Sequence, residues 1–138
     1  MSREVFVNSG PLRFSQDVTI GPHAFVADEP SEEGGKDVGP DPHELLLAAL
    51  GTCASITVQM YAERKQWPVE AVHVHLSYVP IPLESVVGIE MELSLSGDLS
   101  DDQRARLLEI AERCPVHRVL TSQVNIHTTL LVPISRNA

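Results

Sequence analysis

The sequence predicts an α+β fold in which antiparallel sheet wraps around a long, buried central helix, with a second helix beside it. Three observations carry this prediction. Residues 41–67 show a helical pattern whose first half is apolar on every side. Segments before and after it alternate apolar and polar residues, as antiparallel strands do, and residues 101–113 show a second, amphipathic helical pattern.

The long helix has a clear start. Asp41 is placed to cap it, Pro42 occupies the first helical position, and Glu44 falls at the third, which together form a capping box. From residue 45 to residue 58 the side chains are apolar or small all round, so we expect the helix to lie in the middle of the protein. A membrane span needs about 20 apolar residues, so this shorter run predicts no membrane association.

The chain before this helix reads as three short strands and a loop. Residues 4–8 and 12–20 predict a hairpin that turns at Gly10 and Pro11, and residues 23–26 predict a third strand. Residues 27–42 are rich in glycine, proline and acidic side chains. Loops of this length are often functional, although a solvated crossing explains the acidic residues equally well.

The chain after the long helix returns to strands. Residues 71–79 and 86–97 alternate as half-buried strands, and a capping box at Ser100 opens the helix over residues 101–113. Pro115 ends or restarts that helix, and residues 123–132 predict a final strand.

Length, charge and cysteine content limit the number of domains and the kinds of partner that we expect. The 138 residues predict one domain over residues 1–138, and 10 basic against 19 acidic side chains give a net charge of −9. This charge argues against nucleic acid or anionic lipid as a partner. The start of the chain shows no signal-peptide pattern, so we expect a cytoplasmic protein. Two cysteines in a reducing compartment indicate catalytic, metal-binding or inert thiols more than a structural disulfide.

A helix that is apolar on every side requires more cover than one chain supplies. A single sheet covers one face, and the amphipathic second helix covers part of another. A second subunit that packs its own long helix here would bury the remainder. We therefore expect an intertwined, obligate homodimer.

The two cysteines, Cys53 and Cys114, lie on the apolar faces of the two helices. If those faces pack together, the thiols can come within the Cα separation that a disulfide requires. Buried cysteines also serve as small apolar side chains, and helical spacing alone leaves both interpretations open.

Three segments resemble one known family. The runs GGKDVGPDPHELLLAALGTC, ITVQMYAERKQWP and IAERCPVHRVL resemble the OsmC/Ohr family of osmotically inducible and organic-hydroperoxide-resistance proteins. The likeness extends from residues 27–30 to the final strand. The first two runs look closest to a less characterised branch of that family.

The resemblance implies a thiol peroxidase without a cofactor or metal. Cys53 would attack an organic hydroperoxide and become a sulfenic acid, Cys114 would condense with it to a disulfide, and an external dithiol would reduce that bond. The family is dimeric, which agrees with the homodimer expected from the long helix.

The resemblance also points to a thiolate-stabilising arginine, and Arg13 is the best match. In family members with an Asn-Pro-Glu pattern, a glutamate ten residues before the cysteine holds that arginine. Here His43 stands at that position, either as a replacement or as a sign of lost activity. Glu44 lies about 100° further around the helix, where capping already explains it.

Apolar neighbours of Cys53 offer a binding slot. Leu50, Ile56 and Met60 would line it for an alkyl chain, although core packing explains each of them as well. Two rival hypotheses stay open: a non-enzymatic dimeric module that binds a small lipophilic ligand, and a zinc site formed by the cysteines with a histidine.

Overall fold

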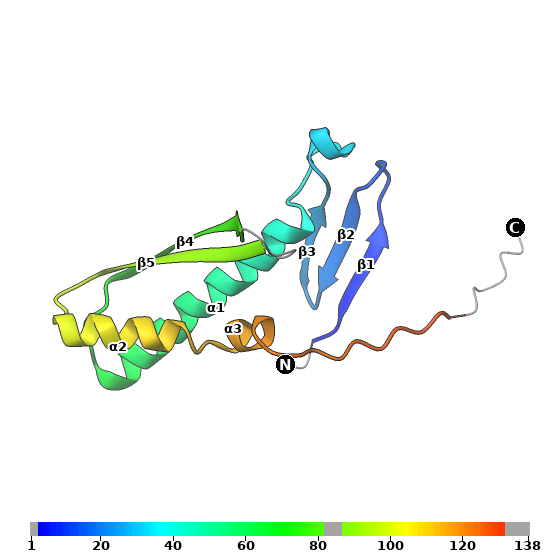
Figure 1. Ribbon diagram of the computed structural model, residues 1–138. Coiled ribbons are helices and arrows are strands. Elements are labelled where there is room, and N and C mark those ends of the chain that lie inside the picture. Colours follow the sequence, from blue (N-terminus) through cyan, green and yellow to red (C-terminus); the bar gives the residue numbers. More distant parts are fainter. Residues whose placement is uncertain (1–2, 82–86, 132–138) are drawn as a thin grey trace, which may run out of the picture.

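The computed structural model describes residues 3–81 and 87–131. The elements follow in the order β1 (Val5–Ser9), β2 (Gln16–Ile20), β3 (His23–Ala27), η1 (Ser31–Glu33), α1 (Pro42–Lys65), β4 (Ala71–Pro80), β5 (Val87–Ser96), α2 (Asp101–Ala111) and α3 (Pro115–Leu120). Figure 1 shows α1 running through the molecule, with β4, β5, α2 and α3 around it and the sheet of β1–β3 at its N-terminal end. The α+β class with antiparallel sheets is confirmed.

Both capping boxes form as the sequence predicts. The Asp41 side chain accepts from the Glu44 N–H at 2.8 Å, while the Glu44 carboxylate accepts from the Asp41 N–H at 2.8 Å. Ser100 and Gln103 repeat this pairing at the start of α2. Each box satisfies backbone N–H groups that the first helical turn leaves without partners.

The first three strands form a meander, in the order β1-β2-β3. Val7 pairs with Val18, and Val18 pairs with Phe25. The hairpin turn is longer than predicted: residues 12–15 belong to the turn, because Ser15 is buried and its backbone carbonyl accepts from Gly10. These bonds close the turn before β2 begins.

The loop between β3 and α1 is organised by Asp28. Its carboxylate is buried and accepts from the backbone N–H groups of Glu29, Lys36 and Val38. Burial raises the pKa of Asp28, but these three hydrogen bonds outweigh it and lower the pKa below its ordinary value. The Asp28 N–H also donates to the carbonyl of Pro40, so both ends of the loop are joined.

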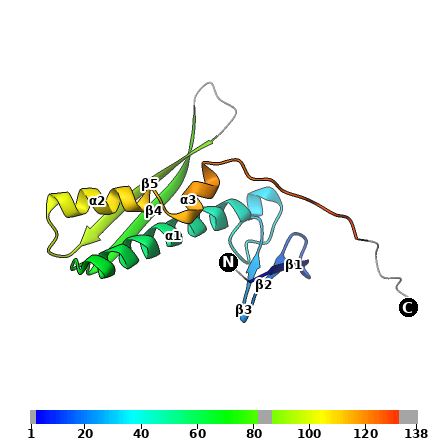
Figure 2. The same cartoon turned by 90° about the horizontal axis from the view of Figure 1, so that it is seen from below.

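The second sheet packs on α1. Strands β4 and β5 form an antiparallel pair, with Val74 opposite Leu93 and Leu76 opposite Met91. Gly51 allows the close approach of α1, because a Cβ there would lie 2.6 Å from Cδ1 of Leu76. In the view of Figure 2, α2 and α3 lie along α1 beside this sheet.

The core lies between α1, α2 and the start of α3. Its buried residues are Leu50, Ala54, Val58, Ala62, Leu107, Ala111 and Cys114. Arg104 anchors α2 to the end of β5 by donating to the carbonyls of Leu95 and Gly97 at 2.6 and 3.0 Å.

Within this chain, α1 is covered on one side only. Ile56 is 50% exposed and Met60 is 67% exposed on the opposite side. By length and composition α1 would be able to span a membrane. Its packing against β4, α2 and α3 makes it instead the core helix of the fold.

The predicted strand over residues 123–132 is wrong for residues 123–131, and residue 132 lies outside the described residues. Residues 123–131 form no strand, and they run away from the body of the molecule (Figure 1). Ile126 is 82% exposed and Leu130 is 95% exposed. The alternating pattern is present, but a strand needs a neighbour to complete its backbone hydrogen bonds, and within the described chain this segment has none.

Candidate functional site

The two cysteines meet where α1 passes the start of α3. Cys53 lies in the middle of α1 and is half-buried, whereas Cys114 is fully buried as the N-terminal cap residue of α3. Both belong to the same apolar cluster, and both are free thiols. The sequence brings them together because Pro115 ends the α2 segment and restarts the helix at this point.

The environment of Cys114 favours the protonated form of its side chain. Burial raises the pKa of the Cys114 thiol, and the adjacent Cys53 side chain raises it further through hydrogen bonding and charge. Backbone N–H groups of His117 and Val116 act in the opposite direction without cancelling the effect. A thiol with a raised pKa is a poor nucleophile at neutral pH.

Cys53 opens onto a groove of about 550 Å³. The groove is lined by Leu45, Ala48, Ala49, Thr52, Cys53, Ile56, Thr57, Met60 and Pro115. Its wall is almost entirely apolar, so it suits an alkyl or aryl group more than a polar one. Cys114 is not among the lining residues, so the groove gives access to only one of the two thiols.

Two of the three predicted slot residues line this groove. Ile56 and Met60 do, but Leu50 is buried in the core and instead lines a separate cavity of about 280 Å³ with Ile89 and Met91. Leu50 precedes Cys53 by three positions, yet α1 turns its side chain towards β5. Thr57, which helical spacing places on the same face as Cys53, also lines the groove, and so does Pro115, which the sequence marked only as a helix break.

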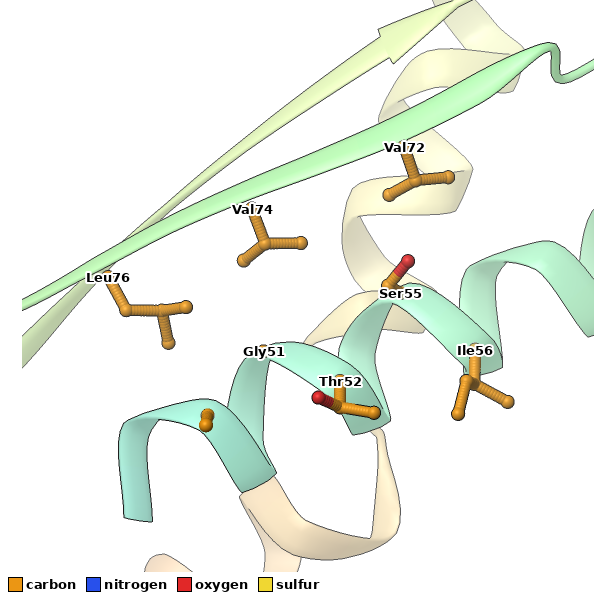
Figure 3. A pocket seen from close by; sticks show the side chains of 8 residues that line it. Gly51, Thr52, Ser55, Ile56, Val72, Val74 and Leu76 are labelled. Carbon is orange, nitrogen blue, oxygen red and sulfur yellow. The ribbon is translucent and has the colours of Figure 1, made fainter. Parts of the chain in front are cut away.

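A second groove follows the neighbouring face of α1. It has a volume of about 390 Å³ and lies between α1 and β4. Figure 3 shows Val72, Val74 and Leu76 from β4 facing Gly51 and Ser55 of α1. Thr52 and Ile56 belong to both grooves, so α1 presents a continuous open surface on this side.

Arg13 lies in the turn between β1 and β2. Its guanidinium carbon is 4.6 Å from the centroid of the Phe14 ring, and it is next to Gly34. This turn belongs to the sheet at the start of α1, and Arg13 is not among the residues that line the groove around Cys53.

His43 lies in the first turn of α1. Its ring packs edge-on against Tyr78 with centroids 5.8 Å apart, and its carbonyl accepts from the Tyr78 hydroxyl at 2.7 Å. Ten helical residues separate it from Cys53, about 15 Å along the axis. Within one chain, therefore, neither Arg13 nor His43 joins the thiol pair.

No group of three or more possible metal ligands occurs among residues 3–81 and 87–131. His73 and His75 point outward from β4, and the nearest acidic partner of His75 is Glu92, at 4.0 Å.

The family follows from sequence and fold together. A family model described as OsmC-like protein matches residues 34–129, which include both cysteines and the whole of α1, and the chain belongs to this family. No curated protein matches the sequence significantly.

Solved structures share the fold at low sequence identity. An OsmC-like protein from Mycoplasma pneumoniae superposes with a TM-score of 0.73 at 17% identity, over 96% of this chain and 99% of that one. An organic hydroperoxide resistance protein from Legionella pneumophila gives 0.67 at 18%, covering 88% and 90% of the two chains. The organic hydroperoxide resistance protein OhrB of Bacillus subtilis gives 0.61 at 17%, covering 91% and 94%.

Proposed function

We propose that this protein is a thiol-dependent peroxidase that reduces organic hydroperoxides. The observation that carries the proposal is the pair of thiols, one open to an apolar groove and the other buried against it. That asymmetry is what a peroxidatic and a resolving cysteine need. Some structural neighbours are named organic hydroperoxide resistance proteins, which agrees with the assignment.

In the first step the Cys53 thiolate attacks the terminal oxygen of the hydroperoxide. The O–O bond breaks, and its electron pair leaves with the organic fragment, which takes up a proton and departs as an alcohol. Cys53 is oxidised to a sulfenic acid. The apolar groove would hold the organic part of the substrate along Ile56 and Met60 and would exclude water from the reacting sulfur.

In the second step Cys114 attacks the sulfur of the sulfenic acid. The S–O bond breaks, water leaves, and a Cys53–Cys114 disulfide forms. An external dithiol then reduces the disulfide by exchange and is itself oxidised. Because Cys114 is shielded until this point, over-oxidation of the second thiol by bulk peroxide is disfavoured.

The site needs a cation near the Cys53 thiolate, and we assign this role to Arg13 of the partner subunit. A homodimer accounts for three features of the single chain: the open face of α1, the exposed edge strand β1, and the unpaired segment over residues 123–131. A second copy would cover the open face of α1. It would also supply strands that pair with β1 and with residues 123–131. His43 would then also lie near the subunit boundary.

Turnover assays test the proposal directly. With cumene hydroperoxide and dithiothreitol, the reduced protein should produce one cumyl alcohol per peroxide consumed. Cys53→Ser should abolish this reaction. After dithiothreitol is removed, one equivalent of peroxide should leave Cys114→Ser with a Cys53 sulfenic acid that dimedone traps, whereas the wild type should form the Cys53–Cys114 disulfide. Unchanged turnover in Cys53→Ser would refute the assignment.

A binding module for a small lipophilic ligand is the second candidate. The groove favours it, and so do the positions of Arg13 and His43 in the single chain, which leave Cys53 without a nearby cation from its own subunit. This function predicts that peroxide treatment forms no disulfide, whereas an apolar ligand still binds stoichiometrically.

A further inference from the structure

A pocket of about 450 Å³ beside the Cys53 groove gathers four arginines. They come from four places in the chain: Arg64 from the last turn of α1, Arg106 from α2, Arg113 from the turn after α2, and Arg118 from α3. The chain has 10 basic residues against 19 acidic ones, so this pocket holds four of the ten. No acidic residue lines it among the described parts of the chain.

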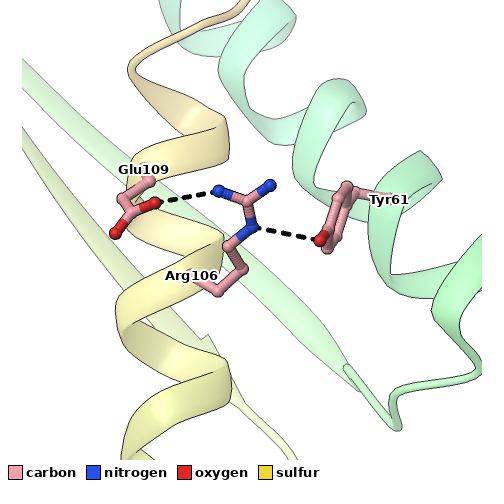
Figure 4. Close-up of polar contacts among 3 residues, drawn as sticks. All are labelled: Tyr61, Arg106 and Glu109. Atoms are coloured by element: carbon pink, nitrogen blue, oxygen red, sulfur yellow. Dashed lines mark hydrogen bonds and ion pairs between the residues drawn. The ribbon is translucent and has the colours of Figure 1, made fainter.

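One arginine is fixed in place by its neighbours. Arg106 donates from Nε to the Tyr61 hydroxyl at 3.1 Å and from Nη1 to Glu109 at 2.9 Å (Figure 4). Its Nη2 takes part in neither contact. Because the Tyr61 oxygen accepts this bond, its own O–H remains free to donate.

The other arginines have little to neutralise them. Within residues 3–81 and 87–131, the only arginine ion pair is that of Arg106 with Glu109. Arg64 lies over the Tyr61 ring, with its guanidinium carbon 5.1 Å from the centroid. The side chains of Arg113 and Arg118 form no hydrogen bond or ion pair within these residues, and both residues are exposed. Guanidinium groups converging without counter-charges are a preferred environment for carboxylate and phosphate oxygens.

The arginine pocket continues into the groove of Cys53. Thr57, Met60 and Pro115 line both. A molecule lying across this boundary would therefore contact guanidinium groups at one end and apolar side chains at the other.

We propose that Arg64, Arg106, Arg113 and Arg118, with the Tyr61 hydroxyl, form a binding site for a carboxylate or phosphate group. That group is either a free anion or the charged end of an amphipathic ligand whose apolar part lies along the Cys53 groove. The anion-binding groups include neither thiol, but an amphipathic ligand would share the Cys53 groove with the proposed peroxide substrate.

Binding of three probes to the full-length reduced protein distinguishes a free anion from an amphipathic ligand. Octanoate, octanol and inorganic phosphate are titrated separately by calorimetry. For an amphipathic ligand, octanoate should bind one per subunit, at least tenfold tighter than octanol and than phosphate. For a free anion, phosphate should bind as tightly as octanoate. Equal binding of octanoate and octanol, or no binding of either anion, would overturn the proposal.

Charge variants locate the site. The double variant R113Q/R118Q should weaken anion binding at least tenfold, and Arg118→Lys should retain part of it. The matched control R3Q/K36Q removes the same charge at residues that do not line the pocket and should bind as the wild type does. If R113Q/R118Q instead changes the oligomeric state and leaves anion binding intact, the arginines serve a subunit interface and the proposal fails.

A readout on the wild-type protein covers the case in which R113Q/R118Q does not fold. An anion beside Tyr61 disfavours its phenolate, so saturating octanoate or phosphate should raise the pH at which Tyr61 ionises. An unchanged Tyr61 titration at saturation would also overturn the proposal.

Discussion

The fully buried thiol of Cys114 lies against the half-buried thiol of Cys53, although 61 positions separate them in the sequence. The contact exists because α3 restarts at Pro115 directly over the middle of α1. The two sulfurs therefore share one local environment but differ in their access to solvent. That difference makes the chemistry of the pair testable one residue at a time.

Alkylation should distinguish the two cysteines. In the native, reduced protein, iodoacetamide should modify Cys53 at least tenfold faster than Cys114, because Cys114 is fully buried and burial raises its pKa. Peptide mass spectrometry at timed intervals measures both rates. In urea the two rates should become similar, and equal rates in the native state would contradict the structure.

The two tyrosines should titrate separately. The chain contains only Tyr61 and Tyr78. The hydrogen bond from Arg106 lowers the pKa of Tyr61, whereas burial, followed by the charge of Asp41, raises the pKa of Tyr78. Absorbance of the phenolate should therefore rise in two steps, with Tyr61 ionising below and Tyr78 above the ordinary value of about 10.

Substitution of Arg106 assigns the first of these steps. Arg106→Gln removes the hydrogen bond and the charge, so only the lower step should move to higher pH. Tyr78→Phe should remove the upper step and leave the lower one in place. A single step in the folded wild type would show that the Arg106–Tyr61 contact is absent in solution.

Neighbouring leucines in α2 provide a matched test of the core. Leu107 is fully buried, and Leu108 is 47% exposed. Leu107→Ala should lower the free energy of unfolding by about 2–5 kcal/mol, since it leaves a cavity against α1. Leu108→Ala should change it by about 0.5 kcal/mol or less. Urea unfolding measures both, and similar losses would refute the assignment of the core.

The proposed dimer makes a prediction about the C-terminal segment. The subunit mass is 15.1 kDa, so light scattering should give about twice this value for a dimer. Ile126→Asp places a charge on the exposed, alternating segment and should favour the monomer if that segment pairs with a second copy. Glu112→Gln, on an exposed position of the turn after α2, is the control and should not alter the mass.

Local signals in the sequence predicted the fold well. The capping boxes at Asp41 and Ser100 depend on side chains three residues apart, so they can be read directly from the sequence. The segment over residues 123–131 shows the opposite case. Its alternating pattern is typical of an extended segment. Whether that segment becomes a strand depends on a neighbouring strand, which the pattern does not specify.

The candidate site was predicted less completely. Helical spacing placed Leu50, Ile56 and Met60 together, yet Leu50 faces the core, because residues three or four positions apart still differ in direction by tens of degrees. No pattern in the sequence indicated the arginine pocket. Arg64 and Arg118 come together only through packing of α1 against α3, which no local pattern encodes.

The network around Asp28 has a consequence for proteolysis. The loop after β3 is long, exposed and rich in glycine, features that ordinarily invite cleavage. Lys36 is its one trypsin site, but the Lys36 N–H is held by the buried carboxylate of Asp28. Native protein should therefore resist trypsin at Lys36, and Asp28→Ala should make that bond one of the first to be cut. A segment that looks like an unstructured linker thus behaves as a folded part of the protein that fixes where α1 begins.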